Sequence, residues 1–293
     1  MRTDIDHLSR VAQIAGLDIQ IDPPRHHHVI LNERRFHFVE WGGSGNPPLL
    51  FLHGGNQSAR TWDIVCLALA DRFHCIALDQ RGHGDSEWSY EGHYAPEHHS
   101  QDIQALADHL SWNRFGLIGM SMGGLNAISY AAESSDHLSA LVCVDVGPFV
   151  QMNRAKALVS FVESNSEPQS FDDLVRAALA HNPRRKEELM RHSLTHTTRE
   201  LSDGSWTWKA DRREKLDLIE MQKRLDKLAD GCRHITCPTL VVRGEQSPTF
   251  SPDDAERFVS LLADARHVTV PDAGHTIQGD NPKGLIEELE KFL

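Results

Sequence analysis

Apolar runs of strand length recur along this chain, and what separates them changes after residue 52. The first three runs, 29–31, 36–41 and 49–52, are divided only by turn residues. The later runs alternate with helix-like stripes, and they cover 75–78, 115–118, 140–146, 239–242 and 267–270. Strands that alternate with helices are parallel and are joined by right-handed crossovers. The pattern predicts an α/β fold with a mostly parallel eight-stranded sheet and helices on both faces.

Two segments depart from this alternation. Residues 4–16 carry apolar side chains at helical spacing, and Asp22, Pro23 and Pro24 end that stretch. Residues 149–230 are rich in charge and in helix formers, and they contain no run typical of a buried strand. We therefore expect an N-terminal helical arm (1–27), a core (28–148 and 231–293) and a helical cap, or lid, inserted at 149–230. The arm would pack on the body of the molecule or on a partner subunit, so a homodimer stays open.

Charge narrows the range of partners. The chain has 293 residues with 30 basic and 42 acidic side chains, which gives a net charge of -12. Nucleic acid and anionic membrane surfaces would repel such a chain. No apolar run approaches the ~20 residues that cross a bilayer, and acidic residues near the start argue against a secretory signal. We expect a cytoplasmic protein that binds neither nucleic acid nor membrane.

The cysteine and histidine patterns argue against disulfides and metals. The five cysteines are an odd number, and none forms a C-x-x-C pair. The 19 histidines include His26, His27 and His28 in a row and the pair His98 and His99. Neither group has the helical His-x-x-x-His spacing of a zinc enzyme. The expectation is free thiols, no metal and no cofactor.

The strongest chemical signal is the pentapeptide Gly119-Met120-Ser121-Met122-Gly123. An apolar run precedes it and a helix-like stretch follows it. A strand–turn–helix of this kind forces its central residue into a strained conformation, which the small flanking residues tolerate. The turn lifts the Ser121 hydroxyl clear of the sheet edge and makes it a candidate nucleophile.

A serine nucleophile needs a base and an oxyanion site. His275 follows the last apolar run in Asp272-Ala273-Gly274-His275, so it can reach the same sheet edge as Ser121. One oxyanion donor is expected from the backbone amide of Met122. The other is expected from Gly55, or alternatively from Asn56, in the loop after the third strand.

These segments together resemble the α/β-hydrolase family over about residues 28–293, apart from the insertion. The matching motifs are Leu52-His53-Gly54-Gly55, Asp79-Gln80-Arg81-Gly82-His83-Gly84-Asp85-Ser86, Gly119-Met120-Ser121-Met122-Gly123-Gly124, Cys237-Pro238-Thr239-Leu240-Val241-Val242-Arg243-Gly244 and Gly274-His275. The resemblance implies a serine nucleophile and a lid at the position of the insertion. We expect Asp79 and Arg81 to order a loop beneath the site rather than to act in catalysis.

The third member of the triad departs from the family pattern. The acid is usually an Asp about four residues past the glycine of Arg243-Gly244, and Pro248 stands there in this chain. The family's alternative position, just beyond the nucleophile helix and the next strand, holds Asp145. Asp145 is therefore the favoured acid. Glu245, Asp253 and Asp254 remain alternatives.

Substrate contacts are expected from Asn56, Trp62, Trp206 and Trp208. Trp206 and Trp208 are two residues apart, so they would alternatively lie on one face of an extended segment and pack the cap down.

The sequence favours a serine hydrolase that cleaves a small carboxylic ester or related acyl compound through an acyl-enzyme. A C–C hydrolase, lactonase or amidase would use the same machinery. A ligand-binding protein with little catalysis is the rival, because Pro248 replaces the usual acid.

Overall fold

The structure is a computed structural model that describes residues 2–150, 164, 168, 170–213 and 218–293. Its centre is an eight-stranded sheet in the order β1-β2-β4-β3-β5-β6-β9-β10. The strands are β1 Arg25–Leu31, β2 Arg34–Trp41, β3 Pro48–Leu52, β4 His74–Leu78, β5 Phe115–Met120, β6 Leu138–Val144, β9 Thr239–Gly244 and β10 Ala265–Val270. Strand β2 pairs antiparallel with β1 and β4, and the other neighbours pair in parallel. The predicted mostly parallel eight-stranded sheet is confirmed.

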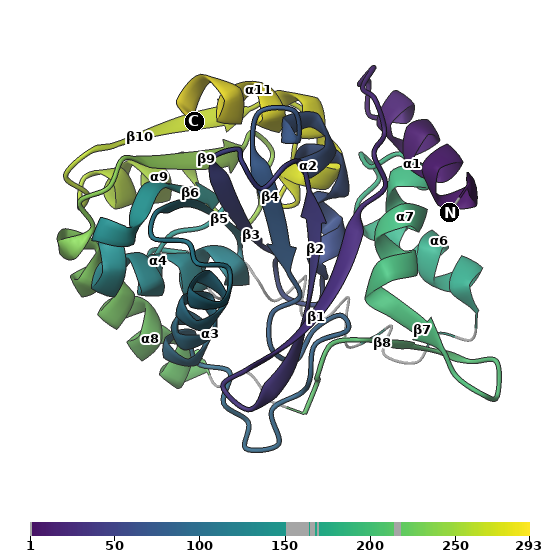
Figure 1. The fold of residues 1–293 in the computed structure, drawn as a ribbon, viewed down its shortest axis with the longest axis horizontal. Helices are drawn as coiled ribbons and strands as arrows, with labels where there is room; N and C mark the ends of the chain where they lie inside the picture. The colour runs from purple at the N-terminus through teal and green to yellow at the C-terminus, as the bar shows by residue number, and fades with distance from the viewer. Residues whose placement is uncertain (1, 151–163, 165–167, 169, 214–217) are drawn as a thin grey trace.

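Helices cover both faces of this sheet (Figure 1). One face packs against α2 (Asp63–Leu69) and α11 (Pro282–Phe292), and the other against α3 (Pro96–His109), α4 (Met122–Ser134) and α9 (Pro252–Val259). Each face has its own apolar core. Alternate residues of the central strands enter the two cores, as Leu49 and Leu50 of β3 do. The buried runs seen in the sequence are continuous because both faces are covered.

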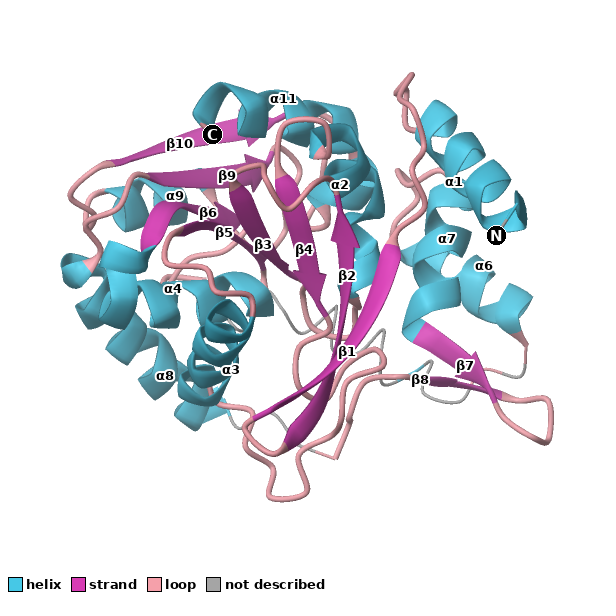
Figure 2. Ribbon diagram, in the orientation of Figure 1, coloured by secondary structure: helices cyan, strands magenta, loops and turns pink. Residues whose placement is uncertain are grey.

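The insertion after β6 forms a smaller unit beside the sheet (Figure 2). Its described elements are α6 Phe171–His181, α7 Glu187–Thr197, β7 Thr198–Glu200 and β8 Trp206–Trp208. β7 and β8 pair as an antiparallel hairpin, and α6, α7 and β8 share a small apolar core of their own. The expected cap also includes residues 151–163, 165–167, 169 and 214–217, which lie outside the described residues.

One part of the expected cap belongs elsewhere. Helix α8, Leu218–Gly231, packs against α4, and its Leu228 enters the core on the α3–α4 face of the sheet. Lys227 Nζ also pairs with Glu97 of α3 at 2.7 Å. The cap boundary at residue 230 is therefore too late. An amphipathic stripe predicts that a helix is partly buried, but it does not say against which neighbour.

The N-terminal arm packs on the body of its own chain. Helix α1, Arg2–Ile14, buries Leu8, Val11 and Ala12 against α7 and α2. Lys186 Nζ donates to the carbonyl of Ile14 at 2.5 Å and ties the end of the arm to the cap. The apolar face of the arm is thus used within the chain. Homodimer formation stays a prediction, and it would need another surface.

The thiols are free, as expected. All five cysteines are buried and free. Among the described residues, no helix is long and apolar enough to span a bilayer.

Candidate active site

The nucleophile candidate lies at a sharp turn between β5 and α4. Ser121 has φ 50° and ψ -119°, a conformation that costs a residue with a Cβ roughly 1–3 kcal/mol. The turn is tight because a Cβ at Gly119 would lie 2.3 Å from the Gly123 carbonyl oxygen. A Cβ at Gly123 would lie 2.5 Å from the carbonyl oxygens of Leu52 and His53. The two glycines therefore allow the elbow to close against the end of β3.

His275 and Asp145 reach the same point from two other strands. Asp145 directly follows β6, and its amide continues the sheet by donating to the Val242 carbonyl at 2.7 Å. His275 lies in the loop after β10. Its Nδ1–H donates to Asp145 Oδ2 at 2.8 Å, and its Nε2 lies 3.0 Å from the Ser121 hydroxyl. This tautomer leaves Nε2 as the acceptor for the serine proton.

The Asp145 carboxylate is fully buried and held in place by further donors. The Gly244 amide donates to Oδ1 at 2.9 Å, and the Ser247 hydroxyl donates to Oδ2 at 2.5 Å. Thr249 Oγ1 lies 3.4 Å from Oδ2 and 2.9 Å from His275 Nδ1. Ser247 and Thr249 flank Pro248, and neither was predicted from the sequence. Their hydroxyls line the position where the family usually supplies its acid.

The alternative acids point to other partners. Glu245 is exposed, and its carboxylate accepts from the Asp272 amide at 3.3 Å. Asp253 is exposed, and Asp254 closes a capping box with Ser251 at the start of α9. The carboxylate that pairs with His275 is that of Asp145. The geometry therefore brings together the expected Ser121, His275 and Asp145.

The loop after β3 lies beside the nucleophile. A Cβ at Gly54 would lie 3.4 Å from the Ser121 Cβ, which shows how close the two backbones are. The Gly54 amide donates to Gln57 Oε1, and the Gln57 amide donates to the Gly54 carbonyl in a turn. Gly55 and Asn56 occupy the middle of that turn and line the pocket. The Met122 amide is at the first position of α4, where a helix leaves an amide without an internal partner.

Buried polar contacts fix this loop. The His53 Nδ1–H donates to the Gly54 carbonyl at 2.8 Å, and its Nε2 accepts from the Gln80 amide at 3.1 Å. The Gln80 side chain donates to the His53 carbonyl and accepts from Asn126 of α4. Burial and the nearby His83 ring lower the pKa of His53 to about 3, so the ring is neutral. The network locks together the loops after β3 and β4 and the nucleophile helix.

Asp79 and Arg81 have the structural contacts expected of them. Asp79 accepts from His37 Nδ1 at 2.7 Å and from the Ala59 and Asp85 amides. Burial alone would raise the pKa of Asp79, but the His37 hydrogen bond and the other donors lower it. Arg81 forms two hydrogen bonds to Asp102, at 2.6 and 2.7 Å. These contacts order the loop and are separate from the Ser121–His275 pair.

A cavity of about 240 Å³ opens beside His275, between the core and the cap. The core contributes Gly55, Asn56 and Thr276, and the cap contributes Ala178, Met190, Leu194 and Trp208. Cationic side chains of Arg184 and Arg185 also line it. Arg185 is buried and paired with Asp280, whereas the Arg184 guanidinium lies over Gly274, next to His275. The cavity has an apolar wall and a cationic one.

The three predicted tryptophans lie in different surroundings. Trp208 lines the cavity and belongs to the cap core. Trp206 packs against Phe171 with the rings tilted and their centroids 4.9 Å apart, and so fits the packing alternative. Trp62 is 0 % exposed and packs on Phe51 beneath α2, so the expectation that it contacts substrate is wrong. A large aromatic residue in sequence is more often part of a core than of a pocket wall.

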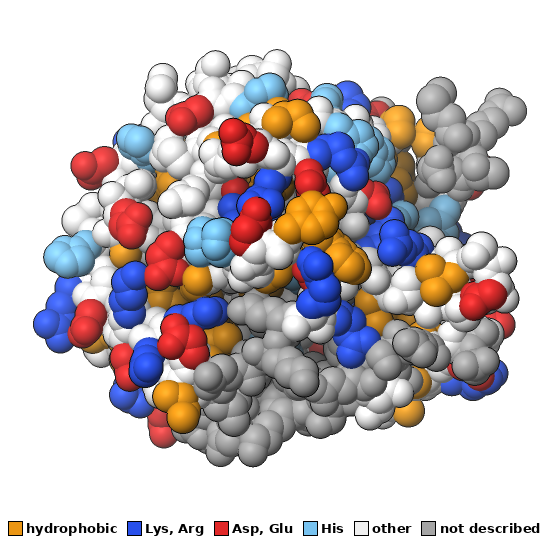
Figure 3. All heavy atoms as spheres, turned by 90° about the horizontal axis from the view of Figure 1, so that it is seen from below, with side chains coloured by type: hydrophobic (Ala, Val, Ile, Leu, Met, Phe, Trp, Pro, Cys, Tyr) orange, Lys and Arg blue, Asp and Glu red, His pale blue; other side chains and the backbone are white. Residues whose placement is uncertain are grey.

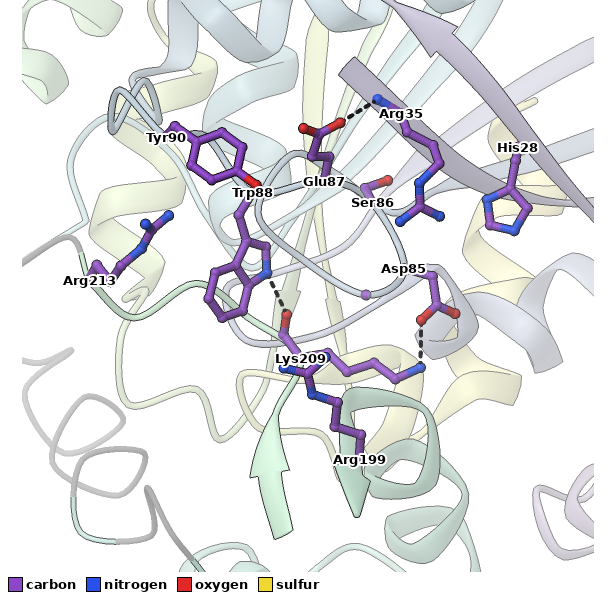
Figure 4. Close-up of a pocket in the computed structure, with 11 residues that line it drawn as sticks. His28, Arg35, Asp85, Ser86, Glu87, Trp88, Tyr90, Arg199, Lys209 and Arg213 are labelled. Carbon is purple, nitrogen blue, oxygen red and sulfur yellow. Dashed lines mark hydrogen bonds and ion pairs between the residues drawn. The ribbon is translucent and has the colours of Figure 1, made fainter. Parts of the chain in front are cut away.

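A larger surface groove, of about 470 Å³, lies between the loop after β4 and the β7–β8 hairpin (Figure 4). Its cations include Lys209, which pairs with Asp85 at 2.9 Å, and Arg213, which pairs with Asp211. The hydroxyl of Ser86, which also lines the groove, donates to the Asp79 carbonyl. Among the residues that line this groove, no serine is hydrogen-bonded to a histidine. Acidic and basic side chains are interspersed on the face seen in Figure 3. We therefore place the chemistry at the His275 cavity.

Comparison with known proteins identifies the family of this chain. The model of the alpha/beta hydrolase fold matches residues 47–282. The chain belongs to the α/β-hydrolase family. Among curated α/β-hydrolase relatives, esterase Rv0045c from Mycobacterium tuberculosis is 32% identical over 87% of this chain and 85% of its own length. A solved structure of that esterase superposes with a TM-score of 0.81 at 31% identity, covering 97% and 96% of the two chains.

A second relative has a more defined substrate. The 2-(acetamidomethylene)succinate hydrolase from Mesorhizobium japonicum is 29% identical over 86% of this chain and 89% of its own length. The crystal structure of E-2-(acetamidomethylene)succinate hydrolase has a TM-score of 0.81 at 25% identity, covering 92% and 99% of the two chains. These relatives make this α/β-hydrolase a hydrolytic enzyme.

Proposed function

We propose that this chain is a serine hydrolase that cleaves small carboxylic esters through an acyl-enzyme. The observation that carries the proposal is the continuous contact from Asp145 through His275 to the Ser121 hydroxyl, at 2.8 and 3.0 Å. Serine is a weak nucleophile unless a positioned base takes its proton. The esterase relative supports an ester as the substrate.

In the proposed reaction, Ser121 Oγ attacks the ester carbonyl while His275 Nε2 takes the serine proton. The amides of Gly55 and Met122 stabilise the oxyanion, and each such donor is worth ~10²–10³ in rate. His275 then protonates the leaving alcohol. Water attacks the acyl-enzyme with His275 as its base, which releases the acid and restores Ser121. Asp145 holds the Nδ1–H tautomer and stabilises the imidazolium in both steps.

The cavity favours a small acyl group that carries its own carboxylate. Met190, Leu194 and Trp208 would pack against the carbon chain. Arg184, which has no ion pair among the described residues, would face a substrate carboxylate near His275. The relative that hydrolyses 2-(acetamidomethylene)succinate acts on a dicarboxylate, which agrees with this preference. The preference for a substrate carboxylate can be tested with a matched pair of substrates. These are a half-ester and a neutral diester of one short dicarboxylic acid.

The experiment is an activity panel of esters, lactones, amides and vinylogous diketones. Wild type should hydrolyse short-chain esters, and Ser121→Ala should lose on the order of 10⁶ in kcat. Arg184→Ala should raise KM for the half-ester and leave the neutral diester unchanged. Faster turnover of amides or diketones than of esters would replace the ester assignment with those reactions. Activity that survives in Ser121→Ala would contradict the serine mechanism itself.

A further inference from the structure

Away from the active site, three metal-ligand side chains converge where the cap meets the core. They are Asp63 at the start of α2 and His192 and His196 on α7, and their nearest ligand atoms all lie within 4.8 Å of one another. Asp63 and His192 are buried, and His196 is partly exposed. The spacing of 192 and 196 is the helical His-x-x-x-His that places two imidazoles on one face.

Asp63 and His192 form a close, buried ion-pair contact in which the imidazole nitrogen lacks an aligned hydrogen bond. His192 Nε2 lies 3.0 Å from Asp63 Oδ2, yet this buried nitrogen has no hydrogen-bond partner among the described residues. Two donors bound at ~2.0–2.1 Å to one ion and 3.0 Å apart subtend roughly 95° at the metal, which is an acceptable ligand angle.

Outer contacts hold both ligands in position. His7 Nε2 lies 3.0 Å from His192 Nδ1, so α1 fixes the ring through its second nitrogen, as ligating histidines require. Arg60 Nε lies 2.7 Å from both oxygens of Asp63. The guanidinium keeps the carboxylate ionised but adds a positive charge to the site. This charge favours a metal that binds imidazole strongly over one that depends on carboxylates.

We propose that Asp63, His192 and His196 bind a divalent transition-metal ion, with Zn²⁺ or Co²⁺ as suitable occupants. The donor set of two imidazoles and one carboxylate is one that such ions accept, with water completing the shell. The site would clip the cap helix α7 to the core helix α2, next to the arm. It revises the expectation that the histidines lack metal-ligand spacing.

A second grouping of ligand side chains differs from this one in how its atoms are paired. His37, Asp79 and Asp85 also bring ligand atoms within 4.8 Å of one another. There, His37 Nδ1 donates to Asp79 at 2.7 Å, and the backbone amides of Ala59 and Asp85 donate to the same carboxylate. Its donors and acceptors are already paired. In the cluster at α7, Asp63 is likewise paired with Arg60, and what differs is the buried His192 Nε2, which has no aligned hydrogen bond among the described residues.

The location links the site to the pocket. Helix α7 carries His192 and His196 on the side that faces α2, while its residues Met190, Ser193 and Leu194 line the cavity beside His275. An ion bound at this site would therefore fix the position of one pocket wall. It would not contact the Ser121–His275 pair.

The test titrates metal-free full-length protein with Co²⁺ and follows visible absorption, with Zn²⁺ as competitor. One equivalent should bind to wild type. His196→Ala and Asp63→Asn should weaken binding roughly 100-fold or more, because losing even an outer partner costs 10–100-fold. His109→Ala, an exposed histidine of α3, is the matched control and should leave binding unchanged. Equal affinity in wild type and His196→Ala would overturn the proposal.

Two further measurements distinguish this site from metal binding elsewhere in the chain. His275→Ala should retain full binding, and loss of binding there with retention in His196→Ala would place the metal at the catalytic histidine and overturn the proposal. Zn²⁺ at a hundredfold excess over its Kd should raise the Tm of wild type by roughly 5 °C and leave that of His196→Ala unchanged. Circular dichroism of metal-free His196→Ala, whose ring is partly exposed, verifies that the variant is folded. These readouts do not depend on hydrolysis, so they stand apart from the serine hydrolase assignment.

Discussion

Asp145 and His275 meet through a 2.8 Å hydrogen bond although they follow different strands, β6 and β10, with β9 between them in the sheet. Asp145 adopts a positive φ of 53° directly after β6. Gly244 at the end of β9 donates to the same carboxylate. The proposed acid thus lies one strand earlier than the position usual in the family.

This relationship predicts which acidic residue matters. Asp145→Asn should lower kcat by about 10⁴, because an amide cannot hold the His275 tautomer or stabilise the imidazolium. Glu245→Gln and Asp253→Asn are matched controls and should stay within about twofold of wild type. Steady-state kinetics on one short ester decides the question. A large loss in Glu245→Gln with little loss in Asp145→Asn would reverse the assignment.

Thr249 is predicted to act as a positioning residue. Its hydroxyl lies 2.9 Å from His275 Nδ1 and 3.4 Å from Asp145 Oδ2, and it touches no reacting atom. Thr249→Val should lower kcat about tenfold with KM unchanged, since a hydrogen bond to a charged group is worth about 1.5 kcal/mol or more. Thr249→Ser keeps the hydroxyl and should recover most of the rate. A KM effect, or no recovery with serine, would indicate a packing role instead.

The two tryptophans of β8 should behave differently. Trp208 lines the cavity, whereas Trp206 packs on Phe171. Trp208→Ala should raise KM because it removes apolar contact area, and it should shift the preference toward longer acyl chains because it enlarges the cavity. Trp206→Ala should leave the chain-length profile unchanged. The comparison is valid when both variants show a cooperative thermal transition, and identical profiles for the two would remove Trp208 from the substrate pocket.

Buried histidines should make the fold sensitive to acid. Burial and neighbouring positive groups lower the pKa of His53 and of His196 to about 3 each. Unfolded histidines take up protons below about pH 6.5, so between pH 6.5 and 3 the unfolded state binds more protons than the folded one. The free energy of unfolding should therefore fall as the pH drops through that window, by about 1.4 kcal/mol per pH unit for each such histidine.

The measurement is urea unfolding at several pH values from 7.5 to 4.5. His109→Ala, which removes an exposed histidine, should show the same slope as wild type. A free energy of unfolding that stays constant from pH 7 to 5 would show that these rings are not buried in the neutral form.

The sequence predicted the sheet and Ser121 because both signals are local. His275 was predicted from its position after the last strand, and Asp145 from the family resemblance. Apolar runs report burial on two faces, and the residues around Ser121 identify a turn with only one good backbone solution. The role of α8 was mispredicted. Its apolar stripe shows that one face of the helix is buried, but the stripe looks the same whether that face packs on α4 or on other cap elements. Trp62 was misplaced for a similar reason. Ser247 and Thr249 were missed because hydroxyls near a strand end carry no motif, and only the fold brings them to Asp145.

The central claim, that Ser121 is the nucleophile activated by His275, is tested most directly by covalent labelling. Intact-mass spectrometry with a fluorophosphonate should show one adduct on wild type, and peptide mapping should place it on Ser121. His275→Ala should label far more slowly, while Ser121→Ala, confirmed as folded by circular dichroism, should not label. An adduct of equal yield on Ser121→Ala, or no adduct on folded wild type, would contradict this mechanism.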